Sequence, residues 1–387
     1  LLESGAADKI TRTLLRMLGQ ERAALSLMSS GYFLSIPVFF DTVFFLLIPL
    51  ARALRMRTKR DYVAYVMAIS GGAVVSHSLV PPTPGPLIMV ENLSPLGLKL
   101  GTAILGGFLL GLIPVGIGLL FSQWRNSRMN IPFRDAPGSS RDDLEEIVNR
   151  SEEDLPSLAA SLLPVVLPVV LIAGHSILKT LDEQMIVPLG ETVLSWTAVV
   201  GNKNFALLAG AVFALVLLKR QRKYSFGKLR DRLDPAIMSA GVIILITAAG
   251  GAFGKMLYRC GIGEALSNIS GGEQISALAL IVLAWLLSSL MKIAQGSGTV
   301  AMITASAMVF SLSEGIQLSF HPLYLFAAIG FGSLVISWMN DSAFWVICKM
   351  GGLTEKETLT TWTPLLVVIG IVGLLEVLIL SQLLPMA

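Results

Sequence analysis

The sequence is poor in charged side chains, in cysteine and in histidine. Charged residues make up 14% of the 387 positions, where soluble domains carry about 25%, and 54% of the chain is hydrophobic. The two cysteines and three histidines stand in no disulfide or zinc spacing. A net charge of +3 is too small to indicate a nucleic-acid partner. These shortages argue against a soluble domain, a metal site and a nucleic-acid surface, and they favour a protein that lies in a lipid bilayer.

Catalytic motifs are missing as well. The sequence has no Gly-x-Ser-x-Gly nucleophile motif and no His/Glu/Asp cluster with metal-binding spacing. We therefore predict no enzyme activity, no cofactor and no metal. A membrane-embedded enzyme, and a structural or sensory membrane protein without flux, remain as alternatives from other classes.

Long apolar runs dominate what is present. Each is long enough, or nearly so, to cross a bilayer, and in lipid such a run must be helical because no water satisfies its backbone groups. Seven runs qualify, at 62–80, 97–122, 158–180, 203–219, 236–256, 321–348 and 364–384. Residues 186–201 are apolar but short, so we expect a peripheral or partly inserted segment there. The predicted fold class is an all-α integral membrane protein.

Two further apolar runs are interrupted by polar residues, prolines or glycines. Run 23–50 contains the carboxylate Asp41 and has basic clusters on both sides. Because positive clusters prefer the cytoplasm, this run is predicted to enter and leave the membrane on one side, as a re-entrant hairpin. Run 277–312 is broken at 295–299 and is predicted to be a second hairpin that enters from the opposite side.

The distribution of Lys and Arg predicts the orientation. Loops 51–61 and 219–232 carry strong basic clusters, so both are predicted to be cytoplasmic in a multi-pass protein of a bacterial-type inner membrane. The chain opens in an amphipathic stretch without a starting Met, so we expect an N-terminal portion to be missing. The predicted parts are a first repeat at 1–123, a cytoplasmic linker at 124–157, linking spans with a basic loop at 158–232, and a second repeat at 233–387.

The order of these segments predicts an inverted repeat. In each half a hairpin precedes a span that breaks at polar residues, at 77–86 in the first half and at 337–342 in the second. The two hairpin tips, Ile36–Val43 and Ile293–Val300, occupy corresponding places. Inverted repeats with discontinuous helices are typical of transporters, and their binding sites lie near the membrane midplane at the breaks.

Polar groups inside membrane segments are costly, so each is a candidate for function. The residues predicted to bind substrate are Asp41, Thr42, Gln295, Gly296, Ser297, Gly298, Thr299, Asn340, Asp341 and Ser342, and the candidates for carrying a proton are Asp41, His77 and Asp341. Backbone N–H groups at the 295–299 tip, beside helix N-termini, suit a carboxylate. The structural alternatives are a cap or ion pair for Asp41, a packing role for His77, and a loop end at Asn340.

Other polar positions have weaker cases for function. Lys292 and Glu264 lie near the second hairpin, where long charged side chains can snorkel to the membrane interface. Segment 81–86 contains four prolines and is predicted not to form regular helix. It is either an unwound part of the site or a periplasmic turn.

At these segments the sequence resembles the gluconate permease family of gluconate:proton symporters, within the ion-transporter superfamily. The resemblance is carried, in order along nearly the whole chain, by Ser35–Asp41, Leu46–Leu50, His77–Pro86, Gly250–Phe253, Gly298–Ala305 and Asn340–Trp345. It implies proton-coupled uptake of gluconate or a related small hydroxy or amino acid. It also implies an elevator-like arrangement, in which a transport domain moves against a scaffold domain that often dimerises.

The predicted function is therefore a secondary active symporter whose partners are a small organic anion, a proton and the lipid bilayer, with a homodimer as a candidate assembly. Within transport, the alternative is a sodium-coupled carboxylate or amino-acid transporter. Unwound carbonyls at Asn340 and Gly296 would suit Na⁺ equally well.

Overall fold

The structure is a computed structural model, and within the residues it describes every regular element is a helix. It describes residues 4–18, 22–129, 131–132, 134, 155–183, 190–225, 227–230, 256, 276–313 and 316–386. The helices are α1 (Ala6–Leu18), α2 (Ala23–Leu34), α3 (Phe40–Thr58), α4 (Tyr62–Leu79), α5 (Pro84–Leu93), the 3-10 turn η2 (Ser94–Leu96), α6 (Leu100–Ser127), α8 (Leu158–Glu183), α9 (Glu191–Val200), α10 (Lys203–Arg222), α13 (Ala277–Gln295), α14 (Gly298–Ser313), α15 (Leu323–Gly332), α16 (Ser342–Met350) and α17 (Glu355–Leu383).

Among the residues that the structure describes, six segments are long and apolar enough to cross a membrane, which confirms the predicted all-helical membrane class. They are Tyr62–Leu96, Leu100–Ser127, Leu158–His175, Asn204–Arg222, Ala277–Gln295 and Glu355–Leu383. Five of the seven predicted runs therefore coincide with a helix of these segments. The run at 236–256 lies outside the described residues except for Met256, and Glu264 and most of the predicted linker lie outside them as well. The run at 321–348 forms two short helices, α15 and α16, separated by the non-helical stretch 333–341.

Two basic segments predicted as loops are partly helical. Helix α3 continues through residues 51–58, and α10 includes Lys219 through Arg222. Arg and Lys are good helix formers, and near a helix C-terminus their charges also favour the helix dipole. The basic clusters therefore extend these helices beyond the apolar runs.

Segment 81–86 also differs in part from the prediction. Four residues, Val80 to Thr83, lie between α4 and α5, and Pro84 to Pro86 form the first turn of α5. Proline is tolerated in a first helical turn because the N–H group it lacks has no partner within the helix there. The interruption of this span is therefore shorter than expected.

The second predicted hairpin consists of α13 and α14, which pack side by side. The turn between them lies at Gly296, which adopts a left-handed φ of +77°. A Cβ atom added there would lie 2.2 Å from the carbonyl oxygen of Asn340. Glycine is thus required both by the backbone conformation and by the close approach of the break after α15.

The first predicted hairpin is more open. Its helices, α2 and α3, pack little against each other, and α2 packs instead along α4. Two glycines permit this contact, because a Cβ on Gly72 would lie 2.2 Å from the Met28 carbonyl oxygen and one on Gly31 would lie 2.7 Å from that of Ile69. Small residues let apolar membrane helices approach closely, which is their main source of attraction in lipid.

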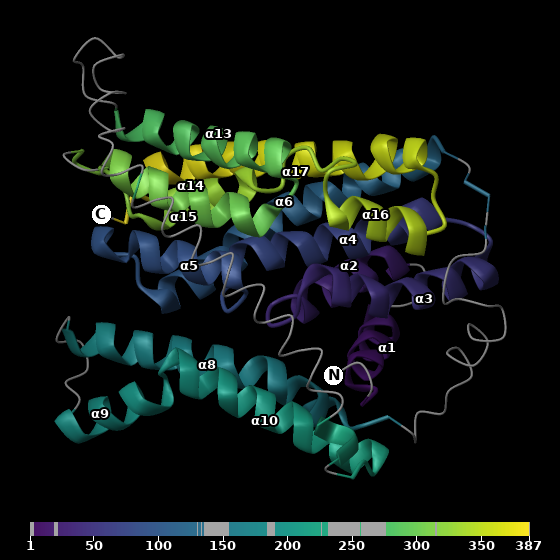
Figure 1. Cartoon of the computed structure of the whole chain (residues 1–387), viewed down its shortest axis with the longest axis horizontal. Coiled ribbons are helices and arrows are strands. Elements are labelled where there is room, and N and C mark those ends of the chain that lie inside the picture. The colour runs from purple at the N-terminus through teal and green to yellow at the C-terminus, as the bar shows by residue number, and fades with distance from the viewer. Residues whose placement is uncertain are drawn as a thin grey trace.

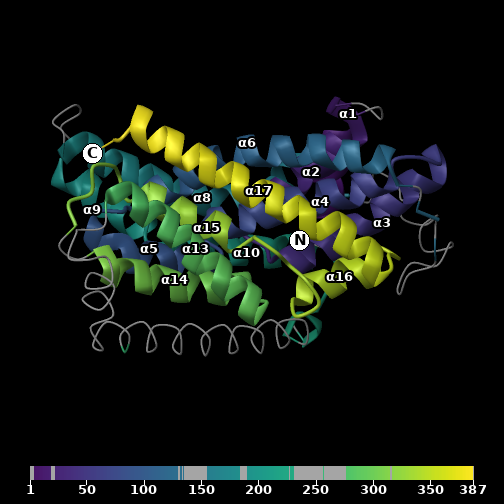
Figure 2. The ribbon, with the colours of Figure 1, turned by 90° about the horizontal axis from the view of Figure 1, so that it is seen from above.

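The helices form an elongated bundle with the two helix breaks near its middle. In Figure 1, α5, α14 and α15 gather toward the end that holds the C-terminus, whereas α3 and α16 extend toward the opposite end. Figure 2 shows α17 running along the length of the molecule, with its first turns beside α16. Helices α8, α9 and α10 form a separate layer, in which α8 contacts α6 and α1.

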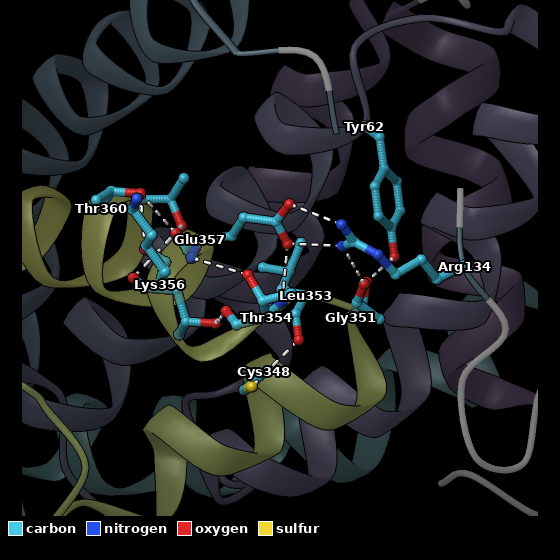
Figure 3. Close-up of polar contacts among 12 residues, drawn as sticks. Tyr62, Arg134, Cys348, Gly351, Leu353, Thr354, Lys356, Glu357 and Thr360 are labelled. Atoms are coloured by element: carbon cyan, nitrogen blue, oxygen red, sulfur yellow. Dashed lines mark hydrogen bonds and ion pairs between the residues drawn. The ribbon is translucent and has the colours of Figure 1, made fainter. Parts of the chain in front are cut away.

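A polar network joins the two halves of the chain near the start of α17 (Figure 3). The Arg134 guanidinium donates to both carboxylate oxygens of Glu357, over 2.6 and 3.0 Å. The buried Arg52 in α3 donates to the Arg134 carbonyl over 2.6 Å, and the Tyr62 hydroxyl of α4 donates to the Gly351 carbonyl over 2.7 Å. Hydrogen bonding to Glu357 raises the pKa of Arg134, so this cation stays charged at any physiological pH.

Candidate functional site

A polar pocket lies where the hairpin tips meet the helix breaks. The pocket has a volume of about 610 Å³, which includes the part that opens to solvent. It is lined by Phe39, Phe40, Asp41, Val74, His77, Ser78, Lys292, Ser297, Gly298, Thr299, Ser333, Leu334, Asp341, Ser342, Ala343, Trp362 and Leu366. These residues come from the start of α3, the end of α4, the α13–α14 tip, the 333–341 break, the start of α16 and the N-terminal half of α17.

The structure brings most of the predicted site residues to this pocket. Those in its lining are Asp41, His77, Ser297, Gly298, Thr299, Asp341 and Ser342. Four others lie beside it without lining it. They are Thr42, Gln295, Gly296 and Asn340.

The four residues outside the lining have local roles or exposed positions. The Asn340 amide donates to the Ile293 carbonyl over 2.8 Å, which ties the break to α13. Gly296 forms the turn, and the exposed Gln295 amide lies 3.6 Å from the sulfur of Met291. Thr42 follows Asp41 in the first turn of α3 and is half-buried. The sequence thus pointed to segments that meet at this pocket, but it did not indicate which of their residues line it.

Three helices begin at the pocket. Helix α3 starts at Phe40, α14 at Gly298 and α16 at Ser342, and all three residues are in the lining. The first turn of a helix carries N–H groups without partners inside the helix and the positive end of its dipole. Three such ends around one pocket favour an anionic group, as helix N-termini do in phosphate and carboxylate sites.

Lys292 is the main pocket residue that the sequence analysis missed. Its ammonium lies 2.6 Å from Oδ2 of Asp341 and donates to the Gly296 carbonyl over 2.8 Å. Lys292 and Asp341 are each only 5% exposed. The expectation that Lys292 snorkels to the interface is therefore wrong, because a buried carboxylate and the turn carbonyl hold its ammonium inside the protein.

Asp341 is held by donors from three directions. Besides Lys292, the Ser337 hydroxyl donates to Oδ2, and the backbone N–H of Ala343 donates to Oδ1 over 3.0 Å, which caps α16. The Trp362 indole donates in turn to the Ser337 hydroxyl over 2.8 Å. Asp341 thus both caps a helix and forms one half of a buried ion pair.

Asp41 and His77 are less constrained. Asp41 has no hydrogen-bond or ion-pair partner among the described residues, although it is half-buried in the pocket. The His77 ring lies 5.5 Å from that of Phe39, and its buried Nδ1 has no partner within the described part of the chain. Both side chains therefore keep hydrogen-bonding capacity for a polar ligand or a proton.

The other histidines have local partners. His175 Nδ1 lies 3.2 Å from the Thr197 hydroxyl, and His321 Nδ1 accepts from the Leu323 N–H over 3.1 Å. Across the described ranges, no three His, Cys, Asp or Glu side chains come together as a metal site would require. The arrangement at the pocket thus offers a cation, three helix N-termini and hydroxyl groups, which together can bind a small hydroxylated anion.

Comparisons with known proteins identify the family of the chain. The family described as GntP family permease matches residues 1–384. The gluconate permease of Pseudomonas aeruginosa is 34% identical over 98% of this chain and 81% of its own length. The low-affinity gluconate transporter of Escherichia coli K12 is 31% identical (99% and 82%), and its Gnt-II system L-idonate transporter is 30% identical (99% and 82%).

The fold is also similar to that of a solved transporter. The crystal structure of the YdaH transporter of Alcanivorax borkumensis covers 100% of this chain and 85% of its own, with a TM-score of 0.57 and 14% identity. The relatives named here are permeases and transporters, not enzymes. The family resemblance expected from the hairpin and break segments is thus confirmed, and the chain belongs to the GntP family of membrane permeases.

Proposed function

We propose that this protein is a symporter of the inner membrane that takes up gluconate or a related small sugar acid, driven by the proton gradient. One observation carries the proposal: three helix N-termini and a buried lysine surround a polar pocket in the middle of an apolar bundle. Such a pocket is costly in a membrane protein unless it binds a polar solute. Relatives named for gluconate and L-idonate point to sugar acids as that solute.

In this proposal the substrate lies between the two hairpin tips and the two helix breaks. The first turns of α14 and α16 hold its carboxylate, with hydroxyls from Ser297, Thr299 and Ser342 beside it. Asp41 accepts from the hydroxyl groups of the substrate. Thr42, Gln295, Gly296 and Asn340 support the tips from just outside the lining.

The coupling ion is a proton in this proposal. Asp41, His77 and Asp341 are the titratable groups of the pocket that can carry it. Sodium is the second candidate, through unwound carbonyls at Gly296 and Asn340. One contact disfavours sodium, because the Gly296 carbonyl already accepts from the Lys292 ammonium over 2.8 Å.

The order of the helices supports an inverted repeat and alternating access. A helix pair, a broken span and a long span follow one another as α2–α3, α4–α5 and α6, and again as α13–α14, α15–α16 and α17. The long spans have 28 and 29 residues. In Figure 1, α3 and α14 leave the middle of the bundle toward opposite ends. We propose that a transport domain containing the tips moves against a scaffold, in a protein that can form homodimers and keeps segments 51–61 and 219–232 in the cytoplasm.

Uptake of labelled gluconate into proteoliposomes tests the proposed function. Accumulation is expected with an inward proton gradient and without sodium, and it is expected to disappear when an ionophore removes the proton gradient. Accumulation driven by a sodium gradient at constant pH would overturn the proton assignment. Failure to bind or move any sugar acid would overturn the substrate class.

A further inference from the structure

We propose that Lys292 is the cation that binds the substrate carboxylate. While the pocket is empty, Asp341 forms an ion pair with Lys292 in place of the substrate. Protonation of Asp341 releases the lysine, so one proton accompanies each carboxylate. This inference rests on the proposed function, and it assigns specific roles within the same pocket.

The position of Lys292 is the first part of the argument. It is the only lysine or arginine among the described residues that line the pocket, and it lies within one turn of the α13–α14 tip. Ser297, Gly298 and Thr299, at the start of α14, line the same space. A carboxylate that reaches this helix N-terminus is therefore adjacent to the ammonium as well.

Charge balance is the second part. The Lys292–Asp341 pair is neutral, because the ammonium lies 2.6 Å from the carboxylate. If a substrate anion entered while Asp341 stayed ionised, two carboxylates would share one ammonium in a buried site, where like charges repel strongly. If Asp341 takes a proton first, the substrate carboxylate replaces it on Lys292, and the new pair is again neutral.

The surroundings of Asp341 suit both protonation states. When protonated, its Oδ2–H can donate to the Ser337 hydroxyl, which keeps a lone pair for the Trp362 indole that now donates to it over 2.8 Å. Its Oδ1 continues to cap α16 through the Ala343 N–H. Protonation thus releases Lys292 while both carboxyl oxygens of Asp341 keep hydrogen-bond partners.

Other charged and titratable groups face the same pair. Asp41 at the start of α3 adds negative charge to the pocket, and His77 at the end of α4 lies in the same lining. Asp41 is also the rival proton carrier, so the test has to compare the two carboxylates directly.

The test compares variants in two assays on proteoliposomes. One assay measures proton-driven accumulation of gluconate, and the other measures exchange of external labelled gluconate for internal unlabelled gluconate, which needs no net proton movement. Asp341→Asn keeps the helix cap and mimics the protonated state. We expect it to lose accumulation while it retains exchange. Exchange by wild type is expected to decline at alkaline pH, and exchange by this variant is not.

Lys292→Gln tests the carboxylate partner. The probe pair is gluconate and its neutral amide, gluconamide, which differ only in the charge of the group proposed to meet Lys292. Wild type is expected to prefer gluconate, and the variant to bind it about tenfold to hundredfold more weakly and to lose that preference. A merely structural role for Lys292 would weaken both ligands alike.

Matched variants keep the test decisive. The double variant Lys292→Gln/Asp341→Asn removes both charges of the buried pair and leaves neither without its partner, so it is expected to stay folded even if Lys292→Gln does not. It should show the same lost preference for gluconate. Lys349→Gln, which breaks an exposed ion pair with Glu355, is the control and should transport like wild type.

The inference and the proposed function can fail separately. If wild type neither binds nor moves a sugar acid, the proposed function fails. If wild type transports gluconate but both Lys292 variants keep their preference for the anion, only the inference fails. It also fails if Asp341→Asn accumulates gluconate, or if Asp41→Asn alone shows exchange without accumulation.

Discussion

Two acid–base pairs in this protein have the same shortest distance and different surroundings. Lys292 and Asp341 meet at 2.6 Å with side chains 6% and 7% exposed, and Arg134 and Glu357 also meet at 2.6 Å with side chains 35% and 18% exposed. The first pair lines the pocket, whereas the second ties residue 134 to the start of α17. Distance alone therefore does not distinguish a functional ion pair from a structural one.

The chemistry of the cations explains the difference. Arg134 presents a planar fork that grips both oxygens of Glu357, a geometry that suits a permanent contact. Lys292 is a compact point charge bound to one oxygen of Asp341, so another carboxylate can replace its partner with little rearrangement. An ion pair therefore indicates a candidate binding site when it is buried and when another carboxylate can take the place of its acidic member. The presence of an ion pair alone does not indicate such a site.

The largest expected effect, a loss of stability, comes from removing the cation of the buried Lys292–Asp341 ion pair. Lys292→Met leaves the Asp341 carboxylate buried without its cation, which typically costs about 3–5 kcal/mol. We expect a large fall in the melting temperature of the purified protein in detergent. Adding Asp341→Asn should recover much of that loss, and a double variant as unstable as the single one would contradict this account.

A second large effect is expected at the hairpin turn. Gly296→Ala places a Cβ 2.2 Å from the Asn340 carbonyl oxygen at a φ of +77°, so the tip must separate from the break. Transport is expected to fall by more than about tenfold, which corresponds to about 1.4 kcal/mol in the barrier. Gly97→Ala is the matched control, because Gly97 has a φ of +99° but no atom within 4 Å of the added Cβ.

If the strain of a left-handed backbone were the only effect of adding a Cβ atom, the two glycine variants would have similar transport rates. The left-handed backbone costs roughly 1–2 kcal/mol for a residue with a Cβ in either place. Only Gly296 adds a clash with the break that lines the pocket. Equal transport defects in the two variants would therefore contradict a specific role for the contact between tip and break.

A smaller effect is expected at the bidentate pair. Glu357→Gln keeps the shape of the side chain but removes the negative charge of the carboxylate, whose two oxygens accept from the Arg134 guanidinium. We expect a loss of stability of about 1 kcal/mol, reduced by partial exposure, and little change in the pH dependence of transport. A change in that pH dependence would show that this network takes part in coupling.

The smallest effect is expected at the surface. Lys349 and Glu355 meet at 2.9 Å with side chains 58% and 45% exposed, where solvent screens the pair. Lys349→Gln should leave the melting temperature within the scatter of the measurement. A clear fall would mean that this pair is more constrained than its exposure indicates.

Much of the site was predictable from the sequence, because polar residues and glycines inside apolar runs are rare. Asp41, the 295–299 tip and Asn340-Asp341 stood out for that reason, and the structure brings these segments together. Lys292 was not recognised, because its carboxylate partner lies 49 positions away along the chain. The same limit applies to Asn340, whose amide turned out to bind the Ile293 carbonyl beside the pocket.

The membrane class, the positions of most spans and the places where the helices break could be predicted from the sequence alone. These features are local, since they depend on apolar runs, prolines and glycines within one or two turns of chain. Which residues line the pocket, and the burial of Lys292 against Asp341 rather than at the membrane interface, became apparent only from the folded arrangement. Those outcomes depend on how α13 packs against the break after α15, a contact between distant segments that no local pattern encodes.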